Sequence, residues 1–481
     1  MKPDQKPDIK PDFTPDIVVV GGGLAGCEAA WQLAKRNFRV RLFEMRPFVR
    51  TAAHETDGLA EVVCSNSFGG EGDTGAAGIL KAELELGDSL ILRCARLSRV
   101  PAGGALAVDR EDFSRRVSGH IEGHPFIEVR REEVTDLPPA AVIATGPLTS
   151  PAMARALQNS IGDRYLSFFD AVAPIVTRES VDMEKAYTAG RYGRGNDYIN
   201  CPMNKEEYLA FYEALIEAER VLPHPGESQS NDTMLSGKDA YFEGCMPIEV
   251  MAARGPDTLR FGPMKPVGLP DPKTGREPYA VVQLRQDNKE GTLYNLVGFQ
   301  TGLKWGEQSR LLRRVPGLEN ADIVRFGVMH RNIYVNAPAV LDEYLRLKKS
   351  DLQENNLKES NFKENNLNES NLRESSFIFL AGQITGVEGY MESTAMGLAA
   401  GVNAARLLAG RPLSPWPRET AIGSLIGYLQ GAETGEKAFQ PMNANLGIFP
   451  PLPQRIKDKR QKARVIYERA LTAARVFWDD L

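Results

Sequence analysis

Two kinds of residue in this chain have the type and spacing to do chemistry: cysteine thiols in turns and one glycine-rich turn. Cys245 follows Glu243-Gly244 and precedes Met-Pro, so a turn holds its thiol near a carboxylate. Cys64 lies in a polar, irregular segment, where it is either a reactive thiol at a loop mouth or a small buried filler. The chain's five cysteines have no CxxC spacing, so we expect neither a metal site nor a disulfide framework.

The glycine-rich turn has the spacing of a dinucleotide-binding site. It follows the apolar run 17–20 and precedes a predicted helix over 27–36 and a strand over 39–43. In this context glycine lets backbone N–H groups approach a pyrophosphate, and the helix N-terminus favours phosphate charge. An acid at the end of the second strand can accept hydrogen bonds from ribose hydroxyls. The predicted cofactor contacts are therefore Gly21, Gly22, Gly23, Leu24, Ala25, Gly26 and Glu44.

Two later segments favour FAD over NAD as the dinucleotide. The segment 141–146 resembles the strand-Ala-Thr-Gly element of two-part flavoproteins. A strand over 377–382, a glycine-rich turn and a small-residue helix from Tyr390 resemble the second half of their FAD site. This half adds Gly382, Gln383 and Gly386 to the predicted cofactor contacts. No second GxGxxG is present for a nicotinamide cofactor, so we expect NAD(P)H to approach the flavin in an open site.

The composition indicates a soluble cytoplasmic protein. Hydrophobic residues make up 42% and charged residues 25%, which is ordinary for a globular chain. No run of 18 apolar residues occurs and the N-terminus has no apolar signal region, so no membrane association is expected. The net charge is −5, so a nucleic acid would have to bind a local basic patch.

The order of the predicted elements indicates an α/β fold, a Rossmann-like FAD-binding domain with an inserted α+β domain. The FAD-binding domain is expected to be discontinuous, over 16–185 and 336–481, with the insertion at 186–335. Residues 1–15 repeat Lys-Pro-Asp and predict a disordered tail. Residues 351–375 form five tandem pentapeptides, too few for a solenoid, and we expect a solvated surface insertion without a catalytic role.

Three basic stretches are candidates for phosphate contacts, although each could equally be a solvated surface. Arg191, Tyr192 and Arg194 form a basic, aromatic, glycine-rich turn, and Lys265 lies in a proline-braced loop. The third stretch, between residues 454 and 464, has six basic residues against one acid.

Five segments together resemble the TrmFO family of folate- and FAD-dependent tRNA (uracil-5-)-methyltransferases, the small Gid-type flavoproteins. They are residues 21–26, 59–67, 241–249, 261–266 and 295–301. The resemblance covers nearly the whole chain from residue 16, with the tail and the pentapeptides as additions. It implies that Cys245 is the nucleophile and Cys64 the second catalytic cysteine, acting as the C5 base, or the reverse. It also makes Arg191, Arg194 and Lys265 candidates for substrate contacts.

The family resemblance implies a specific reaction. Reduced FAD takes a methylene from 5,10-methylenetetrahydrofolate, and NAD(P)H reduces the flavin. A thiolate adds to C6 of the T-loop uracil of tRNA, C5 takes the one-carbon unit, and the product is 5-methyluridine. The expected partners are tRNA and folate, without an obligatory protein partner. Two alternatives remain, an FAD oxidoreductase of a small molecule and a flavoprotein like the larger Gid-type protein that modifies wobble uridines.

Overall fold

The computed structural model describes residues 13–51, 53–162, 165–221, 233–234, 246–327, 329–348, 377–431 and 439–481. Residues 1–12 of the predicted tail, the pentapeptides at 351–375 and Cys245 lie outside these ranges. In the part that is described, no helix is both long and apolar enough to cross a bilayer.

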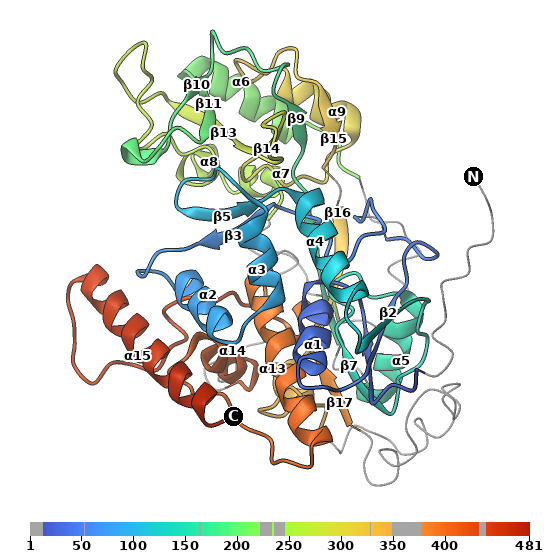
Figure 1. Cartoon of the computed structure of the whole chain (residues 1–481). Helices are drawn as coiled ribbons and strands as arrows, with labels where there is room; N and C mark the ends of the chain where they lie inside the picture. The colour runs from blue at the N-terminus through green and yellow to red at the C-terminus, as the bar shows by residue number, and fades with distance from the viewer. Residues whose placement is uncertain are drawn as a thin grey trace.

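A five-stranded parallel sheet organises the lower half of the molecule (Figure 1). Its first strand is buried along its whole length, as expected when helices cover both faces of a parallel sheet. The strand order is β17-β7-β1-β2-β6, so the late strand β17 enters beside β7. This sheet confirms the predicted α/β fold class. Its strands are β1 (Ile17–Val20), β2 (Val40–Glu44), β6 (Ile127–Arg131), β7 (Ala140–Ile143) and β17 (Phe377–Leu380).

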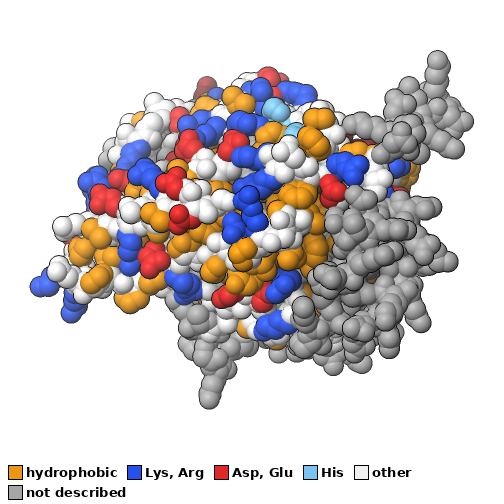
Figure 2. Space-filling view, turned by 60° about the horizontal axis from the view of Figure 1, so that its bottom comes forward, with side chains coloured by type: hydrophobic (Ala, Val, Ile, Leu, Met, Phe, Trp, Pro, Cys, Tyr) orange, Lys and Arg blue, Asp and Glu red, His pale blue; other side chains and the backbone are white. Residues whose placement is uncertain are grey.

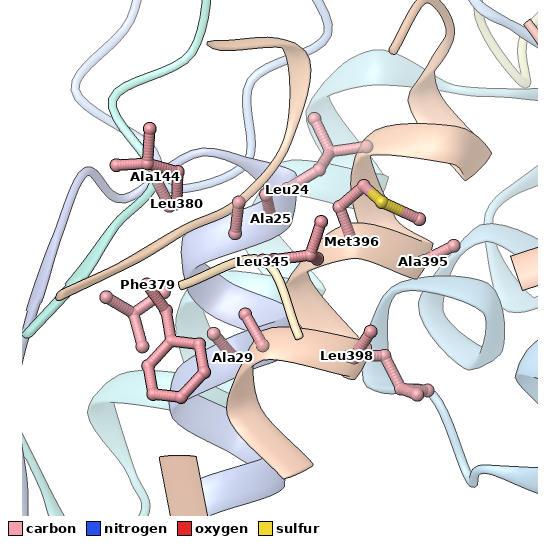
Figure 3. Packing of buried hydrophobic residues seen from close by; sticks show 14 of the residues in the cluster. Leu24, Ala25, Ala29, Ala144, Leu345, Phe379, Leu380, Ala395, Met396 and Leu398 are labelled. Carbon is pink, nitrogen blue, oxygen red and sulfur yellow. The ribbon is translucent and has the colours of Figure 1, made fainter. Parts of the chain in front are cut away.

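Two helices from opposite ends of the chain pack side by side on this sheet. They are α1 (Leu24–Ala34) and α13 (Tyr390–Leu408), the helix predicted to begin at Tyr390. A Cβ on Gly397 would lie 2.2 Å from the Ala25 carbonyl oxygen, and one on Gly401 would lie 2.8 Å from that of Ala29. The paired positions advance together, so the helices run parallel and both N-termini point the same way. Figure 3 shows the apolar side chains that fill this contact.

The remaining helices of the lower half surround the parallel sheet or extend it to one side. The C-terminal helix α15 packs along α2, and α14 also contacts α2 (Figure 1). Side-chain caps begin several of them, such as Asp109, whose carboxylate accepts from the Asp112 amide at 2.8 Å. These helices are α2 (Ala76–Leu86), α3 (Leu90–Leu97), α4 (Arg110–Glu122), α5 (Pro151–Ile161), α10 (Ala337–Val340), α14 (Ala421–Leu429) and α15 (Lys459–Asp479), with the 3-10 turn η6 (Gln383–Thr385).

The upper unit in Figure 1, here called the insertion, has a hydrophobic core of its own. Its sheet has the order β10-β11-β13-β14-β9-β15. Because β9 belongs to this sheet, the insertion's sheet draws on residues before 186. Its elements are β9 (Ile175–Thr177), β10 (Tyr187–Thr188), η1 (Arg191–Gly193), β11 (Tyr198–Met203), α6 (Lys205–Ile216), α7 (Ile248–Ala252), α8 (Thr258–Phe261), β13 (Ala280–Gln286), β14 (Leu293–Leu296), α9 (Trp305–Leu312) and β15 (Ile323–Arg325).

Two small sheets join the units. The antiparallel pair β8 (Tyr165–Ala171) and β16 (Met329–Val335) carries the chain into and out of the insertion, with β12 (Thr233–Met234) at its edge. The second small sheet lies directly below the insertion in Figure 1. It consists of β3 (Ser67–Gly70), β4 (Arg99–Val100) and β5 (Ala105–Val108).

Candidate cofactor cavity and thiol loop

A cavity opens at the carboxyl ends of β1, β2, β7 and β17. This is the edge where sheets of this type bind ligands. The structure brings most of the predicted cofactor contacts to its wall, including residues 21–25, Glu44, Gly382 and Gln383. Gly386 has a packing role instead, since a Cβ there would lie 2.5 Å from the Phe439 ring.

Two glycines of the glycine-rich turn, Gly26 and Gly23, are needed for different reasons. A Cβ on Gly26 would lie 1.8 Å from the Gly21 carbonyl oxygen, so the close packing of helix and turn requires glycine. A Cβ on Gly23 would meet no protein atom within 4 Å, although Gly23 lies in the cavity wall and caps α1. The open space over Gly23 therefore suits a bound pyrophosphate at the N-terminus of α1.

Glu44 is an ionised acceptor at the end of β2. Its carboxylate accepts hydrogen bonds from the Gly22 amide at 3.0 Å and from Nε of Arg46 at 2.9 Å. Burial alone would raise the pKa of Glu44, but the hydrogen bond and charge of Arg46 outweigh burial and lower it. Arg46 in turn pairs with Glu61 at 2.9 Å, and both line the cavity. A carboxylate held ionised here is suited to accept from ribose hydroxyls.

The Cys64 loop, residues 62–67, passes the mouth of this cavity. Val63 and Tyr390 line the cavity, and the Cys64 amide donates to the Tyr390 hydroxyl at 2.9 Å. Cys64 is half-buried, whereas Cys27, Cys94 and Cys201 are fully buried. Among the described cysteines, Cys64 is thus the one that is only half-buried, next to the cavity-lining residue Val63.

Two arginines fix the Cys64 loop from opposite sides. Arg110 of α4 donates to the Cys64 carbonyl at 2.9 Å and to the Val62 carbonyl. Arg285 of β13 donates to Oδ1 of Asn66 at 2.9 Å and to Oγ of Ser65 at 2.6 Å. One anchor comes from the Rossmann-like domain and the other from the insertion, so the loop's position depends on both units.

A second cavity lies between the two units, next to the same loop. Glu61 lines both cavities, while Val62 faces the second and Val63 the first. The segment just before Cys64 therefore borders both cavities. In the described residues, no group of three or more His, Cys, Asp or Glu side chains is arranged to hold a metal ion.

The structure brings together the three basic residues predicted to contact substrate. The Arg191 guanidinium donates to the Lys265 carbonyl at 2.9 Å, the Val267 carbonyl at 2.8 Å and Oε1 of Gln283 at 2.8 Å. Arg191 therefore joins two loops, whereas the Arg194 and Lys265 side chains are exposed beside it. Tyr192 between them is 66% exposed, which leaves a ring face available.

The proposed nucleophile Cys245 lies outside the described residues, but the segment that follows it is firmly anchored. Ile248 begins α7 and its amide donates to the Gln300 carbonyl at 2.8 Å. The buried carboxylate of Glu249 accepts from Oγ1 of Thr301 at 2.9 Å and from the Gly302 amide at 2.8 Å. The family-like segments at 241–249 and 295–301 are thus joined in the insertion.

Comparison with known proteins identifies the family. The family model described as "Glucose inhibited division protein A" matches residues 16–352 and 356–412. The chain belongs to this family. A relative from Moorella thermoacetica is 54% identical over 459 residues, covering 95% of this chain and 96% of its own. One from Thermus thermophilus is 51% identical over 456 residues, covering 95% and 94%. Both are named methylenetetrahydrofolate–tRNA-(uracil-5-)-methyltransferase TrmFO.

Among solved structures, GidA of Aquifex aeolicus in its form II crystal is similar in fold. The TM-score is 0.64 at 16% sequence identity, and the match covers 97% of this chain and 74% of that one. At this identity the match supports the fold, a GidA-like flavoprotein architecture, and nothing more specific.

Sequence reasoning missed Tyr390, Arg110 and Arg285 as site residues. Each acts through a contact with a residue far away in the chain. Tyr390, for example, hydrogen-bonds to Cys64, which lies 326 positions earlier. The one available signal was that Tyr390 begins the helix predicted to approach the flavin.

Proposed function

We propose that this chain transfers a one-carbon unit from 5,10-methylenetetrahydrofolate to C5 of the T-loop uridine of tRNA, giving 5-methyluridine. The observation that carries this proposal is the Cys64 loop, a cysteine whose backbone is held by Tyr390 and Arg110 next to the wall of a dinucleotide-type cavity. About 50% identity over nearly the whole chain to relatives named for this reaction supports it.

FAD is the dinucleotide that we place in the first cavity. The pyrophosphate would lie over Gly23 at the N-terminus of α1, and the ribose against Glu44. The α13 N-terminus, parallel to α1, would direct its positive end toward the flavin. When bound, reduced FAD supplies the electrons and carries the one-carbon unit.

The two thiols divide the chemistry at the uracil ring. The Cys245 thiolate adds to C6, which makes C5 nucleophilic toward the one-carbon unit. The Cys64 thiolate then takes the C5 proton as the one-carbon unit separates from its carrier. The two electrons and the proton that reduced FAD would supply convert the methylene to a methyl group as Cys245 leaves C6 and the ring is restored. The contacts of the Cys64 loop with Arg110 and Tyr390 orient that thiol. Exchanging the roles of Cys245 and Cys64 leaves the atoms and electrons of the reaction balanced in the same way. Single Cys→Ala substitutions distinguish the two assignments.

tRNA would approach the exposed side of the insertion. Arg194 and Lys265 are placed to contact phosphates, while Arg191 holds their two loops together. The exposed ring of Tyr192 is suited to stack on an unpaired base. The uracil must leave the T-loop stack to reach the thiols.

NAD(P)H would reduce the flavin from the open side of the site and then leave. We place the reaction in the cytoplasm, where tRNA and folate are available, and require no protein partner. The role of NAD(P)H, the cytoplasmic location and the independence from a protein partner all follow from the proposed reaction.

The decisive experiment supplies the holoenzyme with NADPH, methylene-labelled 5,10-methylenetetrahydrofolate and tRNA lacking T-loop methylation. We expect label in the T-loop uracil with the wild type and none with Cys245→Ala or Cys64→Ala. A Cys→Ala variant that forms a stable covalent enzyme–tRNA complex retains the nucleophile, so this readout assigns the two roles. NADPH oxidation without label would instead indicate an FAD oxidoreductase, and label in a wobble uridine would indicate the other tRNA-modifying chemistry.

A further inference from the structure

A strip of exposed basic side chains runs over the start of the C-terminal helix α15. We call it the C-terminal basic strip, and its members are Arg455, Lys457, Lys459, Arg460, Lys462 and Arg464. All six are exposed. Arg455 and Lys457 precede α15, and the other four lie on α15 away from the buried residues that pack on α2. The space-filling view shows Lys and Arg side chains projecting at the left-hand end, where Figure 1 places the start of α15 (Figure 2).

The position of these charges does not help the helix. Basic side chains in a first turn face the positive end of the helix dipole, and α15 has no acidic residue in its first turn. The one acid in the stretch, Asp458, caps the helix by accepting from the Gln461 amide at 2.7 Å. In the described residues, Arg464 alone of the six forms an ion pair, with Asp73 at 3.2 Å. Basic side chains in a first turn are electrostatically unfavourable for the helix and bring no stability here. Such an arrangement indicates a functional surface.

A short chain of polar contacts connects the C-terminal basic strip to the loop of the insertion that carries Arg194. Asp73, the ion-pair partner of Arg464, lies two residues after Glu71, whose amide donates to the Gly104 carbonyl at 3.1 Å. The neighbouring Gly103 amide donates to Asp197 at 2.7 Å, three residues after Arg194. In Figure 1 the start of α15 lies on the same side as β10 and β11. The two basic regions are therefore linked through residues 71–73, 103–104 and Asp197.

We propose that the C-terminal basic strip binds the phosphate backbone of the tRNA body while the insertion and the thiols handle the T-loop. The inference rests on the proposed function and adds a second contact region to it. A chain with a net charge of −5 repels RNA overall, so binding requires local basic surfaces of this kind. Such contacts position the RNA without reading its sequence.

The test is tRNA binding as a function of KCl concentration, using the holoenzyme and tRNA lacking T-loop methylation. The variant carries Lys459→Gln, Arg460→Gln and Lys462→Gln. The control removes the same number of exposed charges elsewhere, by Arg313→Gln, Arg314→Gln and Arg475→Gln. We expect the strip variant to bind at least about tenfold more weakly and its salt slope to fall by about 2 to 3. The control should keep the wild-type values, and both should oxidise NADPH without tRNA at the wild-type rate.

Equal salt slopes for wild type, strip variant and control would overturn the inference while leaving the proposed function intact. Equal salt slopes would also be the outcome if the strip binds an acidic protein instead of RNA. A wild type that neither binds nor methylates tRNA would remove the proposed function and this inference together. Wild-type flavin absorbance and thermal midpoint in both variants exclude misfolding as the cause of weaker binding.

Discussion

The guanidinium of Arg110 lies against the carboxylate of Asp287, with Nε to oxygen distances of 2.9 and 3.1 Å. Arg110 begins α4 of the Rossmann-like domain, and Asp287 directly follows β13 of the insertion. Their side chains are 13% and 4% exposed, so the ion pair is largely removed from solvent. The same guanidinium holds the Cys64 carbonyl. One side chain thus ties the thiol loop to the relative position of the two units.

Substituting Arg110→Met should therefore affect both stability and catalysis. It leaves the buried Asp287 carboxylate unpaired, which costs about 3 kcal/mol of unfolding free energy. It also frees the Cys64 loop, so the kcat for methylation should fall more than the KM for tRNA rises. The control is Arg115→Met on the same helix, whose side chain is 71% exposed and whose ion pair contributes at most about 1 kcal/mol. Wild-type kcat in Arg110→Met would show that the arginine does not position the loop.

The two fingerprint glycines give a matched pair of variants. Gly23→Ala adds a methyl group that meets no protein atom, so the thermal midpoint of the apoprotein should stay unchanged while FAD content falls sharply. Gly26→Ala places a methyl group against the Gly21 carbonyl and should destabilise the apoprotein itself, by about 1 to 3 kcal/mol. Flavin absorbance per protein and apoprotein melting separate the effects. A Gly23→Ala variant that retains full FAD would mean the pyrophosphate lies elsewhere.

The sequence was sufficient where the signal is local. The βαβ unit around Gly23, the late strand and the helix from Tyr390 follow from periodicity and glycine spacing, and all three are present. The anchoring of the Cys64 loop was not predictable. It depends on single side chains of α4, β13 and α13, brought together only by the tertiary fold. Arg191 illustrates the same limit, since its charge suggested phosphate binding and its side chain is occupied by loop carbonyls.

The cysteines should react with iodoacetamide in a fixed order. Burial raises the pKa of Cys94 to about 11 and that of Cys201 to about 12, and it also raises the pKa of Cys27. These three thiols are also inaccessible, whereas Cys64 is half-buried in a loop. At pH 8 we expect Cys64 to be alkylated well before the other three, as measured by peptide mass spectrometry. Alkylation of Cys27 or Cys94 at a similar rate would contradict the packing described here.

Arg191 and Arg194 should behave differently despite being three residues apart. Arg194→Gln removes an exposed charge, so tRNA binding should weaken a fewfold without loss of stability. Arg191→Gln removes three hydrogen bonds, two to carbonyls of the 265–267 loop and one to Gln283 of β13, and should lower the unfolding free energy by about 1 to 3 kcal/mol. Thermal melting and tRNA titration of both variants check this. Equal stability losses would mean that Arg194 is also structural.

Lys81 should make stability depend on pH in the alkaline range. Its ammonium is buried between α2 and β3 and donates to the Gly70 carbonyl at 3.0 Å. Burial lowers the pKa of Lys81 from 10.5 to about 8. Between these values the folded protein has lost a proton that the unfolded chain still holds, so unfolding takes up a proton. The free energy of unfolding should therefore rise with pH over this window, by up to about 3 kcal/mol, and this contribution is lost as the pH falls through 8.

Urea unfolding at pH 7.5 and pH 10 measures this effect as the difference between wild type and Lys81→Met, which cannot titrate. The control is Lys205→Met, an exposed lysine at the start of α6. We expect the wild type to gain stability relative to Lys81→Met on going to pH 10, and to change in parallel with Lys205→Met. If Lys81→Met also changes in parallel with the wild type, the ammonium is not desolvated and the packing of α2 on β3 is looser than described.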